Sequence, residues 1–96
     1  MDRFTGKKIL IVGVGKTGFS LINFFSNLNC DVRVTDIKPI FDLNRVVKKL
    51  KRISAVTKMI FGEHVDEDFV DADVVVYSAA VNPQLPQLRL AREKGR

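Results

Sequence analysis

Residues 8–18 have the sequence KILIVGVGKTG and decide the fold. The continuous apolar run that follows the lysine is typical of a parallel strand buried on both faces. Gly13, Gly15 and Gly18 then fit the pattern G-x-G-x-x-G at the point where a strand passes into a helix. In that setting the pattern favours a loop that binds a diphosphate through backbone amides. The stretch therefore predicts a strand, a phosphate-binding loop and a helix, in that order.

The chain beyond this loop alternates between helix and strand patterns. Apolar residues at three- and four-residue spacing predict a helix over residues 17–29, and β-branched alternation predicts a strand over residues 31–35. The later patterns predict, in order, a helix capped by Asp42, a strand over residues 59–61, and a loop or short helix from Glu63. They then predict a strand over residues 73–77 and a last helix that follows Pro83 and Pro86 and ends at Gly95. This order specifies an α/β fold, a Rossmann-like open parallel sheet with helices on both faces.

Length and composition indicate a small soluble domain. The chain has 96 residues, of which 46% are hydrophobic and 28% charged, and this composition excludes a disordered chain. We expect residues 1–96 to form a single domain, cut from a longer polypeptide after the fourth strand and its helix, because a further strand normally follows in such folds. Cys30 has no partner for an internal disulfide, and the chain starts without a secretory signal, so we expect a cytoplasmic location.

The net charge of +5 raises the question of a nucleic-acid partner, and the placement of the charges argues against one. Six basic residues lie between Arg45 and Lys58, and six acidic residues lie between Glu63 and Asp73. The basic stretch has no interleaved aromatic residues, so a solvated helix face is favoured over a nucleic-acid surface. We expect the acidic run to be ordinary surface as well. The chain should be a monomer that binds neither nucleic acid nor a membrane.

Lys16 and Thr17 also make the loop similar to the phosphate loop of nucleoside triphosphatases. That loop requires a glycine five residues before the Gly-Lys pair, and Leu10 stands there, inside the predicted strand. ATP hydrolysis at this loop is therefore excluded. Lys16 is then a charge near a diphosphate or a solvated side chain, and Thr17 is either a hydroxyl donor or a helix cap.

Two further residues are candidates at the carboxyl ends of predicted strands. Asp36, eighteen residues beyond Gly18, can accept a hydrogen bond from ribose hydroxyls of a dinucleotide or from an N–H of a base. Ser78 follows the strand over residues 73–77, where it is a phosphate or sugar contact or a plain strand-end serine. His64 has no second ligand at metal-binding spacing, so we expect a surface or loop histidine and no metal site. The sequence shows no catalytic set.

Three stretches in combination resemble the amino-terminal domain of the Mur ligases, and the similarity extends over nearly the whole chain. They are residues 6–18, residues 34–39 and residues 73–78, and the segments over residues 82–88 and 91–95 add to the similarity. The first half is most similar to the D-glutamate-adding branch of the family. Ser78-Ala79-Ala80 departs from the Ser-Pro-Gly pattern of that branch and is more similar to the alanine-adding branch.

The resemblance implies a domain that binds the uridine diphosphate (UDP) end of a UDP-linked muramoyl precursor, UDP-MurNAc-L-alanine. It implies ATP, Mg²⁺ and D-glutamate for later domains of a full-length ligase of peptidoglycan synthesis, so the 96 residues alone should bind no cofactor and show no ligase activity. The positions carried over are Lys16 and Thr17 for the diphosphate, Asp36 for uracil, and Ser78 as a residue that closes on the ligand. The UDP site expected here also includes Gly13, Gly15 and Gly18 of the loop, the backbone amide of Ile37, and Ala80 as a site of close backbone approach.

Two other interpretations remain open at this point. The glycine pattern and Asp36 equally permit an NAD(P)-binding Rossmann domain of an oxidoreductase or of a redox-sensing regulatory protein. A non-catalytic interaction domain with a decayed site is the third.

Overall fold

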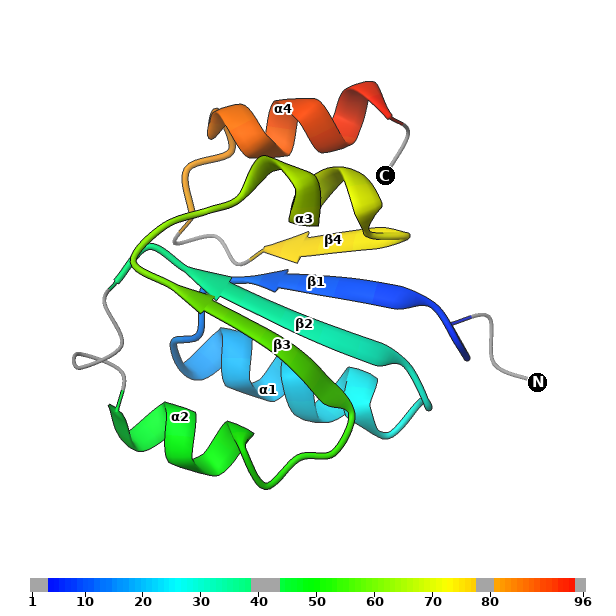
Figure 1. Cartoon of the computed structure of the whole chain (residues 1–96), viewed down its shortest axis with the longest axis vertical. Helices are drawn as coiled ribbons and strands as arrows, with labels where there is room; N and C mark the ends of the chain where they lie inside the picture. The colour runs from blue at the N-terminus through cyan, green and yellow to red at the C-terminus, as the bar shows by residue number, and fades with distance from the viewer. Residues whose placement is uncertain (1–3, 39–43, 78–80, 95–96) are drawn as a thin grey trace.

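The computed structural model describes residues 4–38, 44–77 and 81–94, and Figure 1 shows a parallel sheet between two pairs of helices. The elements are, in chain order, β1 (Lys8–Val12), α1 (Lys16–Ser26), β2 (Asp31–Asp36), α2 (Asn44–Leu50), β3 (Val56–Phe61), α3 (Asp66–Asp71), β4 (Val74–Tyr77) and α4 (Pro86–Glu93). The strand order is β3-β2-β1-β4, and every neighbouring pair is parallel. The predicted Rossmann-like α/β fold is therefore confirmed. Within the described ranges, no helix combines the length and apolar content that crossing a membrane requires.

The central strand β1 is buried on both faces. Ile9 and Ile11 belong to the apolar cluster that includes residues of α1 and α2, whereas Leu10 and Val12 belong to the cluster of α3 and α4. All four side chains are at most 1% exposed. Because successive side chains of a strand point to opposite faces, burial of both faces requires a continuous apolar run. This requirement explains why the run in residues 9–12 has no polar alternation.

The structure lengthens one predicted element and decides between two predictions for the stretch after it. β3 begins at Val56, three residues before the predicted start. The sequence pattern missed the first half because β3 is an edge strand and carries exposed Thr57 and Lys58 there. The stretch after β3 contains the six-residue helix α3, which is the short helix of the two predicted alternatives. The predicted cap at Asp42 and the predicted helix end at Gly95 lie outside the described residues.

The acidic segment is not ordinary surface throughout. Asp68 of α3 is only 4% exposed and accepts a hydrogen bond from the ammonium group of Lys58 on β3. This ion pair joins the edge strand to the helix that crosses over the sheet. The prediction of an ordinary acidic surface is therefore wrong at Asp68, because the ammonium group of Lys58 neutralises its charge.

A charge cluster joins three elements at the amino-terminal edge of the sheet. Asp71, the last residue of α3, accepts hydrogen bonds from Arg33 Nη1 at 2.7 Å and from Lys8 Nζ at 3.2 Å. Asp31 Oδ2 lies 3.3 Å from Arg33 Nη2. The hydrogen bonds from Arg33 and then Lys8 hold the pKa of the Asp71 carboxyl below its ordinary value of 3.8.

We expect Asp71→Asn to destabilise the fold at neutral pH and to have no effect at low pH. A carboxyl group whose pKa falls on folding stabilises the folded state above its unfolded pKa, and this stabilisation is lost as pH falls through the folded pKa. The difference in unfolding free energy between the wild type and Asp71→Asn should therefore be constant above about pH 5 and shrink as pH falls below it. Urea denaturation over a pH series would measure it. A difference that grows on acidification would contradict the stabilising role of the Asp71 carboxylate.

Added salt provides a second check on the same cluster. The Asp71 and Lys8 side chains are 52% and 42% exposed, so solvent ions reach their pair. The effect of the substitution should be small and should shrink further when the ionic strength is raised.

Candidate functional site

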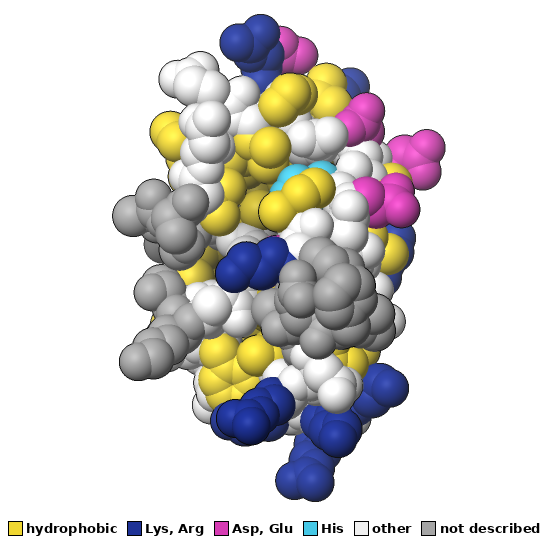
Figure 2. Space-filling view, turned by 90° about the vertical axis from the view of Figure 1, so that its left-hand side faces the viewer, with side chains coloured by type: hydrophobic (Ala, Val, Ile, Leu, Met, Phe, Trp, Pro, Cys, Tyr) yellow, Lys and Arg dark blue, Asp and Glu magenta, His cyan; other side chains and the backbone are white. Residues whose placement is uncertain are grey.

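The carboxyl ends of the strands meet at one edge of the sheet, where the direction of strand addition reverses. From β1 the chain continues to β2 and β3 on one side and then returns to β4 on the other side of β1. Ligands of open parallel sheets bind at such a switch point. Figure 2 shows the molecule from this side, with apolar side chains exposed over the face and Lys and Arg side chains gathered at the end where α2 lies.

Three glycines shape the loop between β1 and α1, each in a different way. Gly13 has a φ of +90°, which side-chain-bearing residues rarely adopt, and donates its N–H to the Thr35 carbonyl at 2.8 Å. A Cβ at Gly18 would lie 2.0 Å from the Gly13 carbonyl oxygen, so α1 approaches the loop as only glycine allows. Gly15 is the N-cap of α1, and a Cβ there would meet no described atom within 4 Å. The loop therefore has the predicted tight turn and close approach, with open space at Gly15.

Asp36 ends β2, and backbone amides hold its carboxylate on two sides. Oδ2 accepts the N–H of Val14, inside the loop, at 2.8 Å, and Oδ1 accepts the N–H of Lys38 at 2.9 Å. The residue is only 8% exposed. Each carboxylate oxygen has a second lone pair, so Asp36 retains acceptor capacity for a ligand. The sequence predicts only the ligand contact, whereas the structure adds a contact with the glycine loop.

The other predicted site residues are described to different degrees. Ile37 directly follows β2 and is 62% exposed. Lys16 and Thr17 lie in the first turn of α1, where backbone amides lack intrahelical partners. The structure describes their backbone only. Ser78 and Ala80 lie outside the described residues altogether. Their roles stay predictions.

His64 lies between β3 and α3 and has contacts that the sequence does not reveal. Its Nδ1 is 2.8 Å from Thr35 Oγ1, and its ring packs edge-on against Phe69 with centroids 5.7 Å apart. Burial lowers the pKa of His64 below its ordinary value of 6.5, and the negative charge of Asp36 opposes this shift. The half-buried imidazole thus connects the end of β2 to the segment after β3. The hydrogen-bonded pair is 29 residues apart in sequence, so no local pattern could have signalled it.

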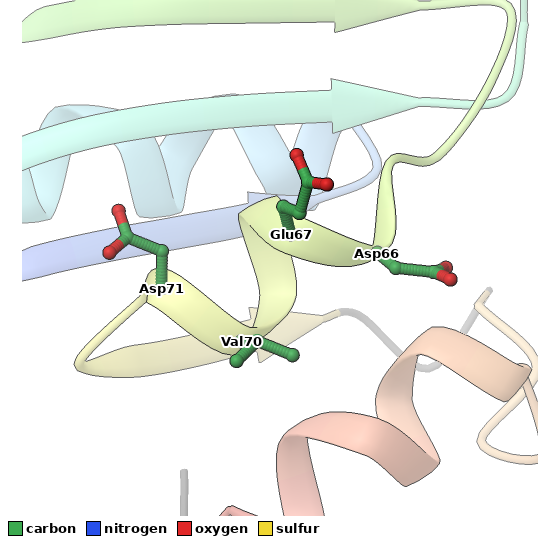
Figure 3. A pocket seen from close by; sticks show the side chains of 4 residues that line it. All are labelled: Asp66, Glu67, Val70 and Asp71. Carbon is green, nitrogen blue, oxygen red and sulfur yellow. The ribbon is translucent and has the colours of Figure 1, made fainter.

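A pocket on the outer side of α3 does not overlap the predicted site. Asp66, Glu67, Val70 and Asp71 line it, and Figure 3 shows their side chains pointing in different directions from the helix. Asp66 accepts a hydrogen bond from Gln87 Nε2 of α4 at 3.0 Å, and Asp71 belongs to the charge cluster above. In the described part of the chain, no three His, Cys, Asp or Glu side chains are grouped to hold a metal ion. Asp66 and Asp71 therefore act as partners of neighbouring elements.

A solved structure shares the fold of this chain but has a different sequence. The chain is similar to SirC, a precorrin-2 dehydrogenase, with a TM-score of 0.59 over 96% of this chain and 42% of that chain. The two sequences are 18% identical, so this likeness concerns the fold alone.

Comparison of sequences identifies the relatives of the chain. It is 38% identical over 91 residues to the UDP-N-acetylmuramoylalanine--D-glutamate ligase of Clostridioides difficile, and 35% identical over 92 residues to the ligase of the same name from Geobacter metallireducens. These alignments cover 95% and 96% of this chain but 20% of each relative, so the chain spans about a fifth of their length. Residues 7–96 match the family model of the Mur ligase MurD-like, N-terminal domain. The chain therefore belongs to the MurD-like N-terminal domain family of the Mur ligases.

Proposed function

We propose that this chain binds the UDP end of UDP-N-acetylmuramoyl-L-alanine, as the amino-terminal domain of a ligase that adds D-glutamate. The observation that carries the proposal is the open space at Gly15, at the N-terminus of α1 and next to the buried Asp36 carboxylate. Backbone amides at a helix N-terminus attract an anion, and a carboxylate beside them can accept a hydrogen bond from a base. The names of the sequence relatives supply the substrate.

Each predicted site residue has a part in this proposal. Gly13 and Gly18 shape the loop, and Gly15 lets the diphosphate approach the backbone. The amides of Lys16 and Thr17 and the Thr17 hydroxyl bind the diphosphate. Asp36 accepts the N3–H of uracil and the backbone amide of Ile37 serves as a further contact, while Ser78 closes on the ligand from the end of β4 and Ala80 allows a close backbone approach.

In the proposed function, the ligation of D-glutamate takes place in parts of the protein beyond this domain. The relatives are five times as long as the matched stretch, and their names imply ligation of D-glutamate. In the full-length protein ATP and Mg²⁺ would activate the carboxyl end of the precursor. In this proposal the chain itself binds and orients the nucleotide end, as a monomer in the cytoplasm.

Calorimetry with UDP, CDP and NAD tests this proposal. If Asp36 accepts the N3–H of uracil, cytosine presents an acceptor lone pair in its place, and two acceptors then face each other. An unsatisfied buried acceptor costs about 1–3 kcal/mol. UDP should therefore bind about 5- to 150-fold more tightly than CDP, and NAD should bind more weakly than UDP.

The same titration can also overturn the proposal. The fold is shared with a dehydrogenase, and an NAD(P)-binding domain would use Asp36 to hold ribose hydroxyls. In that case UDP and CDP should bind about equally, and NAD should bind more tightly than both. That result would replace the proposed function with nicotinamide-dinucleotide binding.

A further inference from the structure

We propose that Asp36 is a positioning residue for the diphosphate half of the site, in addition to any contact that it makes with the base. This inference rests on the proposed function, because it concerns the same site. The Asp36 carboxylate joins the glycine loop to the turn after β2, through the N–H groups of Val14 and Lys38. We infer that these two hydrogen bonds keep the loop in the shape that a diphosphate requires.

The contacts of Val14 show why its amide matters to the loop. Val14 lies between Gly13 and Gly15, and its side chain is 1% exposed in the core cluster that includes residues of α1 and α2. The core thus fixes the side chain and Asp36 fixes the amide. The peptide that leads into Gly15 is therefore held from both sides, directly before the open space where we place the diphosphate.

Asp36 is itself held firmly enough to act as such a support. Its own carbonyl accepts the N–H of Gly62, which follows β3, at 2.9 Å. The preceding residue, Thr35, accepts the N–H of Gly13 at 2.8 Å. Two consecutive residues of β2 therefore bind two consecutive amides of the loop, one through its backbone and one through its side chain.

The chemistry of Asp36→Asn separates positioning from charge. A carboxylate has two acceptor oxygens, whereas a carboxamide has one oxygen and one NH₂ group. Asparagine can therefore satisfy only one of the two backbone amides, and the other would face a donor. Coulomb's law predicts the opposite sign, because removal of a negative charge near a diphosphate should tighten binding. The direction of the change thus decides between the two effects.

The test uses inorganic pyrophosphate, which has no base, and UDP, with binding followed by NMR shifts of the backbone amides. We expect Asp36→Asn to weaken pyrophosphate about 5- to 150-fold, and UDP at least as much because UDP also has the base contact to lose. Asp36→Glu keeps the charge but moves the oxygens by one methylene, so it should weaken pyrophosphate as well. If Asp36→Asn fails to fold in a thermal unfolding control, the Glu variant decides the question.

Asp73→Asn is the matched control. Asp73 Oδ2 accepts the N–H of Lys8 at 2.8 Å, so it is also a carboxylate that binds a backbone amide near β1, but at the opposite end of the sheet. This variant should change both affinities by no more than about two-fold. An equal loss in Asp73→Asn would show that general weakening of the sheet, and not the loop, explains the effect.

The outcomes distinguish this inference from the proposed function. Pyrophosphate affinity that is unchanged or tighter in the folded Asp36 variants would overturn the inference, as would a wild type that does not bind pyrophosphate. A loss of pyrophosphate binding in the Asp36 variants, combined with a preference for NAD over UDP in the wild type, would support the positioning role and overturn only the uridine assignment.

Discussion

Replacement of Gly18 by alanine should lower the melting temperature of this chain by about 8–16 °C. Alanine normally stabilises a helix by about 1 kcal/mol relative to glycine, so helix propensity predicts a gain. The added Cβ would lie 2.0 Å from the Gly13 carbonyl oxygen, and this contact is with backbone that cannot rotate away. Overpacking of a core costs about 1–3 kcal/mol and occasionally more, and a backbone clash belongs at the upper end. At about 4–8 °C per kcal/mol for a small domain, packing outweighs propensity.

The control for Gly18→Ala is Asn23→Ala in the same helix. Asn23 is exposed on α1, so the change adds alanine without a close contact. Its melting temperature should stay the same or rise by a few degrees, as helix propensity predicts. Thermal unfolding followed by circular dichroism measures both variants. A melting temperature of Gly18→Ala equal to that of the wild type would show that α1 can move away from the loop without cost.

The fold was predictable because its main signals are local. The apolar run of β1 and the glycine spacing after it depend on neighbouring residues, so the sequence indicated the strand, the turn and the helix in order. The edge strand β3 was predicted too short for a physical reason. Thr57 and Lys58 are exposed, so the first half of β3 lacks the apolar pattern of a buried strand.

The parts of the site that the sequence missed depend on contacts between distant residues. The hydrogen bond from Val14 to Asp36 spans 22 residues, and that between Thr35 and His64 spans 29. Such pairs form only once the strand order brings β1, β2 and β3 together. The sequence could therefore place Asp36 at the correct edge, but it could not show that one carboxylate oxygen binds the glycine loop and the other binds the turn after β2.

Replacement of Gly15 by valine should leave the fold intact and abolish binding of UDP. Gly15 has φ −68° and ψ −167°, extended values that valine adopts, and its Cβ would meet no described atom within 4 Å. Valine is a poorer N-cap than glycine, which should cost about 1 kcal/mol of stability. In the complex, however, its methyl groups would fill the space of the diphosphate. Loss of two charge-assisted hydrogen bonds at about 1.5–3 kcal/mol each weakens UDP by more than about 100-fold.

Lys16→Ala provides the comparison that identifies what holds the diphosphate. If backbone amides hold it, removal of the neighbouring ammonium group should weaken UDP much less than Gly15→Val does, because the amides at the start of α1 stay in place. Calorimetry with UDP on both variants, each checked by thermal unfolding, measures the two losses side by side. A larger loss in Lys16→Ala would show that the lysine charge carries the site, and the proposed role of the open space at Gly15 would then be wrong.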